Sequence, residues 1–468
     1  MSGPEHSHPT LDDPVVAAFS EGVGGPIGSR ATGHPWWTPT RVILLLTALC
    51  FAVGMVQKAP CFNDGWQDTN LRYANACYSD LPYLYTARGF AELSWPYSDD
   101  EGLRARHQVM EYPVGISYWA WGAAWVTHRL AGSPDIDARY DVAPGELWGM
   151  PAVQREIRLF VVVNALGFAL LTLMSSLFLT RVNPQRPWDA AIFAASPALA
   201  LTGLINWDLL AVVLVAGALW AWSRGSPVLT GVLIGLGAAT KLYPLFLLGG
   251  VLVICLRDRR LRAFTQTAIA VGLAWAVANA PAYLSGPEQW RVFWTFNSER
   301  GADLGSLWLV AVQGWDLTLT PEDINQGSGV LFVVWCAGVL AVGLMAPSTP
   351  RLAQLGFLIV AGFLLVNKVY SPQYVLWLLP LAALARPRWR DQLIWLAGEI
   401  FYFLVVWWYL GGFIAPASGD DVPLYWLAIV LRVLAELYVI AIVGRDVLVP
   451  ERDPVERSAP QRQPTSVR

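Results

Sequence analysis

Apolar runs of about 20 residues recur along most of the chain and constrain its fold more than any other feature. Runs of this length cross a bilayer as helices, because a helix satisfies its backbone polar groups internally. Only 14% of the 468 residues are charged, whereas a water-soluble domain has about 25%. The sequence therefore predicts an all-α polytopic membrane protein with about twelve spans, near residues 41–57, 157–180, 188–205, 207–223, 226–239, 241–256, 263–284, 328–346, 351–367, 372–385, 391–412 and 423–444.

The apolar stretch 114–126 decides the threading, because a span there would move every later loop to the opposite side. If it does not span, more than half of the 32 Lys and Arg residues lie on one side, which indicates the cytoplasm. That side includes the basic runs 257–262 and 386–390, and the short outer loops hold only Lys241, Arg291, Arg300 and Lys368. We therefore expect a cell-membrane protein with both termini cytoplasmic and a surface helix at 113–130.

The remaining organisation follows from this threading. Residues 41–445 form one membrane domain with two large outer segments, 58–156 and 285–327. The tails 1–40 and 446–468 are polar and have no apolar signal core, so we expect both to be disordered and cytoplasmic.

The polar stretch from Cys61 to Tyr112 is acidic and aromatic, which is unusual beside a first membrane helix. Its carboxylates include Asp80, our candidate for the reactive group, and the rivals Asp64 and Asp68. Asp80 has a structural alternative, as a cap for a helix beginning at residue 81. Cys61 and Cys77 would form a disulfide in an oxidising compartment, and the alternative is two free thiols.

Several polar residues fall on the outer side in this threading, at loops or helix ends. Polar side chains at membrane depth cost free energy and usually face the interior of the bundle. They suggest one site near the outer leaflet and comprise Asp80, Glu111, Asp208, Lys241, Arg300 and Lys368. Asp208 has two interpretations, a contact to a sugar hydroxyl or a cap for the next helix. For Arg300, the alternative to a role in this site is an ion pair with Glu299.

Two breaks between apolar runs resemble each other. Residues 240–244 and 367–372 each bring a Lys and a Tyr to the break and have a Pro that opens the next helix. A helix N-terminus beside a Lys is an anion site, especially for phosphate. The alternative is an ordinary tight hairpin whose Lys reaches toward the interface.

The combination of these segments resembles the GT-C class of membrane glycosyltransferases, and most closely glycosyltransferase family 87. The segments that carry the resemblance, over roughly 41–445, are 79–85 (SDLPYLY), 111–114 (EYPV), 206–210 (NWDLL), 239–244 (ATKLYP) and 368–374 (KVYSPQY). The long insert at 61–77, with its two cysteines, departs from the simplest family pattern. This insert would help to determine which acceptor the enzyme uses.

The resemblance implies an inverting transfer of a sugar, most simply mannose, from a polyprenyl phosphate to an extracytoplasmic lipid or glycan acceptor. Asp80 would be the general base. The donor phosphate would be held by Lys241, Tyr243, Arg300, Lys368 and Tyr370. The sugar or acceptor would contact Glu111, Tyr112, Asp208, Asp64 and Asp68, with pairing of Glu111 to Arg104 or Arg106 as the alternative for that residue.

No cofactor or metal is expected, because fixed cations can stabilise the leaving phosphate, and no metal motif is present in the sequence. The net charge of −3 gives no indication of nucleic-acid binding. The expected partners are the lipid-linked donor, the acceptor and membrane lipids. The sugar identity stays open between mannose, arabinofuranose and glucose. The competing functions are a transporter or lipid flippase without chemistry, and a scaffold subunit.

Overall fold

The computed structural model describes residues 13–23, 34–414 and 422–457, and these residues form helices and turns without a strand. Six helices are long and apolar enough to cross a membrane: α2 (Pro39–Gln57), α10 (Pro151–Val182), α16 (Leu261–Ser285), α19 (Pro321–Met345), α22 (Trp389–Leu410) and α23 (Pro423–Leu448). Shorter apolar helices pack among them: α13 (Leu209–Ser223), α14 (Pro227–Ala238), α15 (Leu247–Arg257), α20 (Leu352–Val366) and α21 (Val375–Ala385). The chain is an all-helical polytopic membrane protein.

The expected continuous span at 188–205 is wrong. Three short pieces occupy it: η2 (Pro187–Ala190), α11 (Ala191–Ala194) and α12 (Pro197–Thr202). Pro197 has no backbone N–H to donate to a preceding turn, so it opens a new helix instead of continuing α11.

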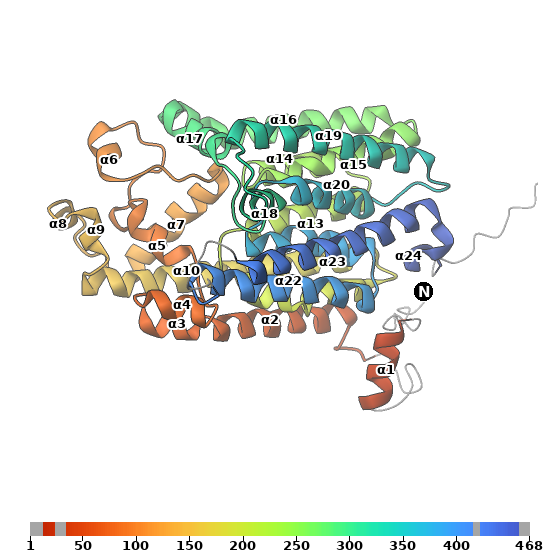
Figure 1. Ribbon diagram of the computed structural model, residues 1–468, viewed down its shortest axis with the longest axis horizontal. Coiled ribbons are helices and arrows are strands. Elements are labelled where there is room, and N and C mark those ends of the chain that lie inside the picture. The colour runs from red at the N-terminus through yellow and green to blue at the C-terminus, as the bar shows by residue number, and fades with distance from the viewer. Residues whose placement is uncertain (1–12, 24–33, 415–421, 458–468) are drawn as a thin grey trace, which may run out of the picture.

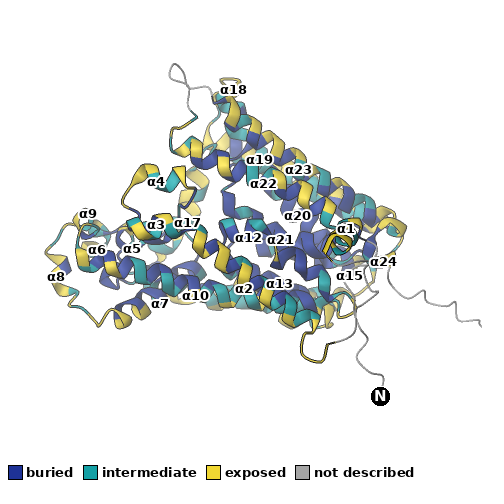
Figure 2. Cartoon of the chain, turned by 90° about the horizontal axis from the view of Figure 1, so that it is seen from below, coloured by how far each residue is buried: buried dark blue, intermediate teal, exposed yellow. Residues whose placement is uncertain are grey.

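The long helices run side by side, and a group of short helices covers one end of the bundle (Figure 1). Figure 2 shows that the buried residues gather between the long helices, whose outer faces are exposed. The short helices of the covered end are α3 (Ala59–Asp64), α4 (Thr69–Ala74), α5 (Leu81–Ala87), η1 (Phe90–Glu92), α6 (Glu101–Arg106), α7 (Val114–Leu130), α8 (Asp137–Tyr140), α9 (Pro144–Leu147), α17 (Pro287–Glu299) and α18 (Leu307–Gly314).

Small residues set the closest approach between helices. Gly231 and Gly235 lie one turn apart on α14, where a Cβ would meet the backbone carbonyls of Thr267 and Val271 on α16. Glycine at both positions lets the two backbones pack directly, as small residues do between membrane helices. The predicted surface helix at 113–130 is present as α7, which packs beside α10 through a hydrogen bond from Trp119 Nε1. Its position on a membrane surface stays a prediction.

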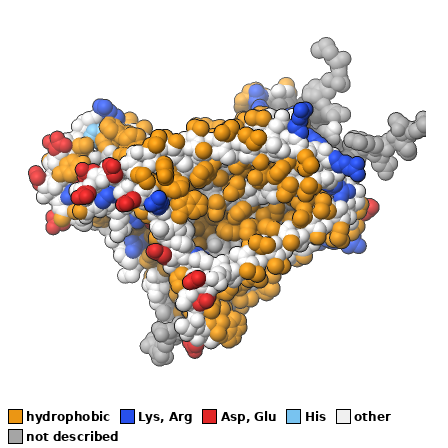
Figure 3. Space-filling view, turned by 90° about the horizontal axis from the view of Figure 1, so that it is seen from above, with side chains coloured by type: hydrophobic (Ala, Val, Ile, Leu, Met, Phe, Trp, Pro, Cys, Tyr) orange, Lys and Arg blue, Asp and Glu red, His pale blue; other side chains and the backbone are white. Residues whose placement is uncertain are grey.

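The opposite end of the bundle is rich in arginine, and Figure 3 shows an apolar band that separates this end from the end covered by the short helices. Arg386 pairs there with Asp391 at 2.8 Å and with Asp446 at 2.7 Å, and all three side chains are buried. Arg351 bonds to Asp453 at 2.9 Å, which docks the segment after α23 onto the bundle.

The expected disorder of both tails is wrong for the described parts. Residues Pro14–Val23 form α1, and Asp13 accepts a hydrogen bond from the Trp389 backbone N–H at 3.0 Å. After α23 the chain forms η5 (Pro450–Arg452) and α24 (Pro454–Arg457). The tail residues 1–12, 24–33 and 458–468 lie outside the described residues.

Candidate active site

A cavity of about 830 Å³ lies at the end of the bundle covered by the short helices. Its walls come from segments far apart in the sequence: the turn before α5, the loop before α7, the loop before α13, helix α17, both Lys-containing breaks and the end of α22. Of the predicted site residues, those that line it are Asp80, Glu111, Tyr112, Lys241, Tyr243, Arg300 and Lys368.

Asp80 precedes α5, but its side chain makes no capping hydrogen bond to that helix. Instead, the Tyr78 hydroxyl donates to Oδ1 at 2.8 Å and the Asn206 amide donates to Oδ2 at 2.7 Å. The same amide nitrogen lies 2.7 Å from the Tyr112 hydroxyl, and the Asp80 backbone N–H donates to the Ile205 carbonyl at 2.8 Å. The carboxylate is therefore held in one orientation at the cavity wall by two separate segments.

The electrostatics around Asp80 suit a base. Burial raises the pKa of Asp80 above its ordinary value of 3.8, while the hydrogen bonds from Tyr78 and Asn206 and the charge of Lys241 oppose that rise. A carboxylate with a raised pKa accepts a proton more readily than a solvated one.

Lys241 lies in the break between α14 and η3 (Tyr243–Phe246). Its Nζ is 3.4 Å from Asp208 Oδ1, which also accepts a hydrogen bond from Trp377 Nε1 at 2.6 Å. The ammonium is 4.9 Å from the centroid of the Tyr112 ring. Asp208 is fully buried, makes no cap to α13, and is not among the described residues that line the cavity. Asp208 is therefore linked to the cavity through its ion pair with Lys241. The two expected roles, a contact to a sugar hydroxyl and a cap for the next helix, do not describe this geometry.

Arg300 and Lys368 form a second cationic region on the cavity wall. Lys368 Nζ donates to Asn325 Oδ1 at 2.5 Å, and Arg300 Nε pairs with Asp303 Oδ2 at 2.6 Å in place of Glu299, the partner considered above. The Asp303 backbone N–H donates to the Lys368 carbonyl at 2.8 Å, which joins the two segments. Burial and the charge of Arg300 lower the pKa of Lys368. An anion bound between the two cations would offset that repulsion.

Glu111 lines the cavity, but the expected pairing with Arg104 or Arg106 is wrong. Its Oε2 accepts from Arg88 Nη2 at 2.8 Å and Nε at 3.0 Å. Arg106 pairs with the buried Glu92 at 2.6 Å instead. The Arg88 pair leaves the other Glu111 oxygen without a charged partner among the described residues.

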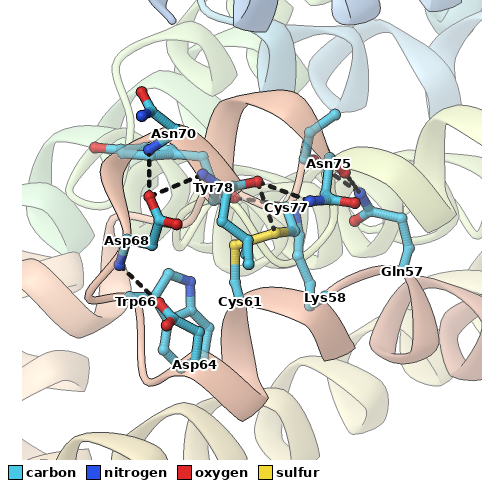
Figure 4. Close-up of a disulfide and its surroundings, with 12 residues drawn as sticks. Gln57, Lys58, Cys61, Asp64, Trp66, Asp68, Asn70, Asn75, Cys77 and Tyr78 are labelled. Carbon is cyan, nitrogen blue, oxygen red and sulfur yellow. Dashed lines mark hydrogen bonds between the residues drawn. A yellow bond between two sulfur atoms is a disulfide. The ribbon is translucent and has the colours of Figure 1, made fainter.

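Cys61 and Cys77 form a disulfide that closes the insert containing α3 and α4 (Figure 4). The two rival carboxylates lie in this insert. Asp68 caps α4 by accepting from the Asn70 backbone N–H at 2.8 Å, and Asp64 accepts from the Asp68 backbone N–H at 2.7 Å. Neither lines the cavity enclosed by the described residues, so neither is positioned as Asp80 is.

Tyr370 was predicted to face the donor phosphate, but its side chain is buried and is not among the described residues that line the cavity. Its hydroxyl donates to both oxygens of Glu399 at 3.0 Å, and the Arg432 guanidinium lies 3.6 Å from its ring centroid. Arg432 pairs in turn with Glu436 at 3.0 Å. Since the Tyr370 N–H donates to the Leu304 carbonyl at 2.6 Å, this buried network supports the wall that carries Arg300 and Lys368.

Four residues of the site were missed by the sequence interpretation. Tyr78 and Asn206 bond directly to Asp80, and Trp377 bonds to Asp208. Lys58 is buried and donates to the Tyr78 carbonyl at 2.9 Å, and burial lowers its pKa to about 7. Only Asn206 gave a usable signal, since it is a polar residue beside Asp208 at an outer loop.

Residues 150–372 match the model of glycosyltransferase family 87. Over this region the chain is similar to glycosyltransferase family 87, which supports its being a glycosyltransferase. The matched region of this glycosyltransferase holds Lys241, Arg300 and Lys368, while Asp80 and Glu111 precede it. No curated protein matches the sequence.

Proposed function

We propose that this glycosyltransferase moves a sugar, with inversion, from a polyprenyl phosphate to an acceptor hydroxyl in the cavity, and that Asp80 is the general base. The observation that carries the proposal is the shared cavity, in which one oriented carboxylate faces the same space as three cationic side chains. A base must lie within hydrogen-bond reach of the proton that it removes, and the cavity leaves room for a hydroxyl beside Asp80.

The reaction balances without a further reactant. Asp80 takes the proton of the acceptor hydroxyl as its oxygen attacks the anomeric carbon from the face opposite the phosphate. The bond between the anomeric carbon and the phosphate oxygen breaks, and the polyprenyl phosphate leaves with the bonding electrons. Because the new bond forms on the opposite face, the anomeric configuration inverts.

The leaving phosphate gains negative charge in this step, and fixed cations stabilise such charge most when they are already oriented. Lys241, Arg300 and Lys368 would supply them. Tyr243 adds a hydroxyl donor, because it lines the cavity and its Oη is buried without a hydrogen-bond partner among the described residues. That the reaction needs no metal or other cofactor stays a prediction.

The donor sugar in this proposal is mannose, and the acceptor is an extracytoplasmic glycan or lipid. We place the enzyme in the cell membrane with both termini in the cytoplasm and the cavity outside. The arginine-rich end of the bundle, opposite the cavity, supports this orientation because cytoplasmic loops carry an excess of Lys and Arg. The disulfide on the cavity side supports it as well, since disulfides persist in oxidising compartments.

The test uses wild-type protein and the Asp80→Asn variant, each incubated with radiolabelled polyprenyl-phosphate mannose and a crude extract of lipids and glycans. We expect label transfer by the wild type and a loss of about 10²–10⁴-fold in the variant, with donor binding retained. Asp68→Asn is the matched control and should keep wild-type activity, because Asn also caps helices well.

Each other outcome has a defined meaning. Full activity in Asp80→Asn would contradict the assignment of the base. Failure of the wild type to bind or use either the mannose or the arabinofuranose donor would contradict the donor class and favour a transporter or flippase.

A further inference from the structure

The end of α2 and the residues just after it hold the segment that leads to the base through three contacts (Figure 4). Gln57 Nε2 donates to the Ala76 carbonyl at 2.7 Å. Lys58 Nζ donates to the Tyr78 carbonyl at 2.9 Å. The disulfide fixes Cys77, which lies between these two carbonyls in the sequence. The first long helix therefore positions the segment from which the base projects.

Lys58 differs from the other two contacts because it brings a charged group into the protein interior. Its side chain is 4% exposed, and it is not among the described residues that line the cavity. It forms no ion pair with a described carboxylate. Burying an ammonium costs free energy that one hydrogen bond to a carbonyl does not offset. The neighbouring Gln57 makes the same kind of bond without a charge, so the backbone contact alone does not account for a lysine at this position.

The charge of Lys58 interacts with that of Asp80. Burial lowers the pKa of Lys58, and the negative charge of Asp80 opposes that change. The interaction is mutual, because a carboxylate that stabilises a cation is itself stabilised in its ionised form. Tyr78 connects the two groups, since its carbonyl accepts from Lys58 and its hydroxyl donates to Asp80 at 2.8 Å.

The other groups that face Asp80 leave a need for this charge. Lys241 favours the ionised carboxylate, but it lies 3.4 Å from Asp208, whose negative charge acts in the opposite sense on Asp80. In the proposed mechanism Lys241 also contacts the donor phosphate, so its charge is shared with the substrate. Lys58 does not line the cavity, and its charge acts on Asp80 whether or not the donor is bound. The remaining polar groups around the carboxylate are neutral hydrogen-bonding side chains: Tyr78, Asn206 and Tyr112.

We propose that Lys58 is a positioning residue for the reaction, whose buried charge holds Asp80 in its ionised form and whose hydrogen bond fixes the Tyr78 backbone. The inference rests on the proposed function for the role of Asp80 as base. Lys58 acts through Asp80 and not on the substrate, because it does not line the cavity. Its removal therefore changes the protonation of the base and leaves the binding of the donor unchanged.

The first test measures the protonation of Asp80 without catalysis. Infrared difference spectra between successive pH values show the band of each carboxyl group that becomes protonated, and the band missing in Asp80→Asn belongs to Asp80. We expect the midpoint of this band to rise by about one pH unit in Lys58→Met, because a nearby opposite charge lowers the pKa of a carboxyl group. Lys58→Gln keeps a hydrogen-bond donor without the charge and should show the same rise. Lys58→Arg keeps the charge and should stay close to the wild type.

Two matched controls separate the charge of Lys58 from its contact and from charge removal in general. Gln57→Met removes the neutral contact to the same segment. Arg129→Met removes an exposed cation of the predicted outer segment that does not line the cavity. Neither variant should move the midpoint of Asp80. Monodisperse elution and an intact disulfide identify folded variants.

The second test measures kcat and the donor KM against pH with polyprenyl-phosphate mannose. In Lys58→Met the acidic limb of kcat should move to higher pH by the same amount as the infrared midpoint. A displacement of about one pH unit lowers kcat roughly tenfold at pH values below both pKa values of Asp80. The donor KM should stay unchanged, and Lys58→Arg should restore the wild-type profile.

The two tests separate the inference from the function. A raised midpoint in Lys58→Met, without sugar transfer by the wild type, would support the charge interaction and overturn the transferase mechanism. A wild-type midpoint in folded Lys58→Met or Lys58→Gln would overturn the inference, whatever the activity. A change confined to the donor KM would also overturn it, because Lys58 would then act on donor binding.

Discussion

At the scale of single residues, Asp80 combines a pKa raised by burial with a carboxylate that hydrogen bonds hold in one orientation. Its two oxygens accept from Tyr78 and Asn206, and its backbone is bonded to Ile205. Lys241 and Asp208 add charges of opposite sign nearby, which partly cancel at the carboxylate. The protonation of this carboxylate, the base in our proposal, therefore depends on a few named hydrogen bonds, each open to substitution.

At this scale we predict a shift in pH dependence for Tyr78→Phe, which keeps the ring and removes the hydroxyl. In the proposed mechanism Asp80 must be deprotonated to act, so kcat/KM should fall as the pH drops through its pKa. The Tyr78 hydrogen bond lowers that pKa, so its loss raises the pKa and moves the acidic limb to higher pH. The pH profile of kcat/KM for the two proteins checks this. A limb that stays in place, or moves to lower pH, would contradict a role of Asp80 as base.

A second residue-scale prediction concerns donor binding. Lys368→Met removes a cation whose hydrogen-bond partner, Asn325, is neutral, so no buried charge is left unpaired. A hydrogen bond to a charged group contributes about 1.5–3 kcal/mol, and we expect kcat/KM for the donor to fall roughly 10- to 100-fold. Lys368→Arg should retain much of the activity. An unchanged kcat/KM for the donor in a folded Lys368→Met variant would remove this residue from the donor site.

At the scale of elements, the two Lys-containing breaks illustrate what the sequence could predict. A Lys between two apolar runs must avoid the lipid, because a charged side chain is costly there. Both Lys241 and Lys368 line the cavity. The same reasoning misplaced Tyr370, because its direction depends on a buried network with Arg432, more than 60 residues away. Asn206 could not be linked to Asp80 for a similar reason, since only folding brings their segments together.

The disulfide is the element-scale feature with the clearest effect on stability. It joins residues 16 apart, and a loop of that size contributes about 3 kcal/mol by restricting the unfolded chain. We expect the variant with both Cys61→Ser and Cys77→Ser to unfold at lower temperature, and reductant to lower the midpoint of the wild type only. Thermal unfolding followed by tryptophan fluorescence measures both. Equal midpoints for the wild type and the variant would show that the insert is held by its packing alone.

At the scale of the whole molecule, charge divides the bundle into two ends. The cavity lies at the end with the disulfide, and the arginine-rich end anchors both α1 and the segment after α23. Apolar periodicity predicted most of the helices between these ends, but it could not show the break at Pro197 or the folded parts of the two tails. Those depend on local backbone chemistry and on ion pairs across the bundle.

This division makes a prediction about sidedness. In intact cells, a membrane-impermeant maleimide should label Gln108→Cys, which is exposed in the loop between α6 and α7. Arg262→Cys, exposed at the start of α16, should react only after permeabilisation. The wild-type protein is the control for its free thiols Cys50, Cys255 and Cys336. The reverse labelling pattern would invert the proposed orientation.

The disulfide also has a consequence for biosynthesis. Cys61 and Cys77 both precede α10, so on the proposed threading they reach the outer compartment before the second long helix is made. The bond can then form while the ribosome is still translating most of the membrane domain. The turn that carries Tyr78 and Asp80 would be shaped early, and the later helices, which bring Asn206 and the cations, would assemble around it.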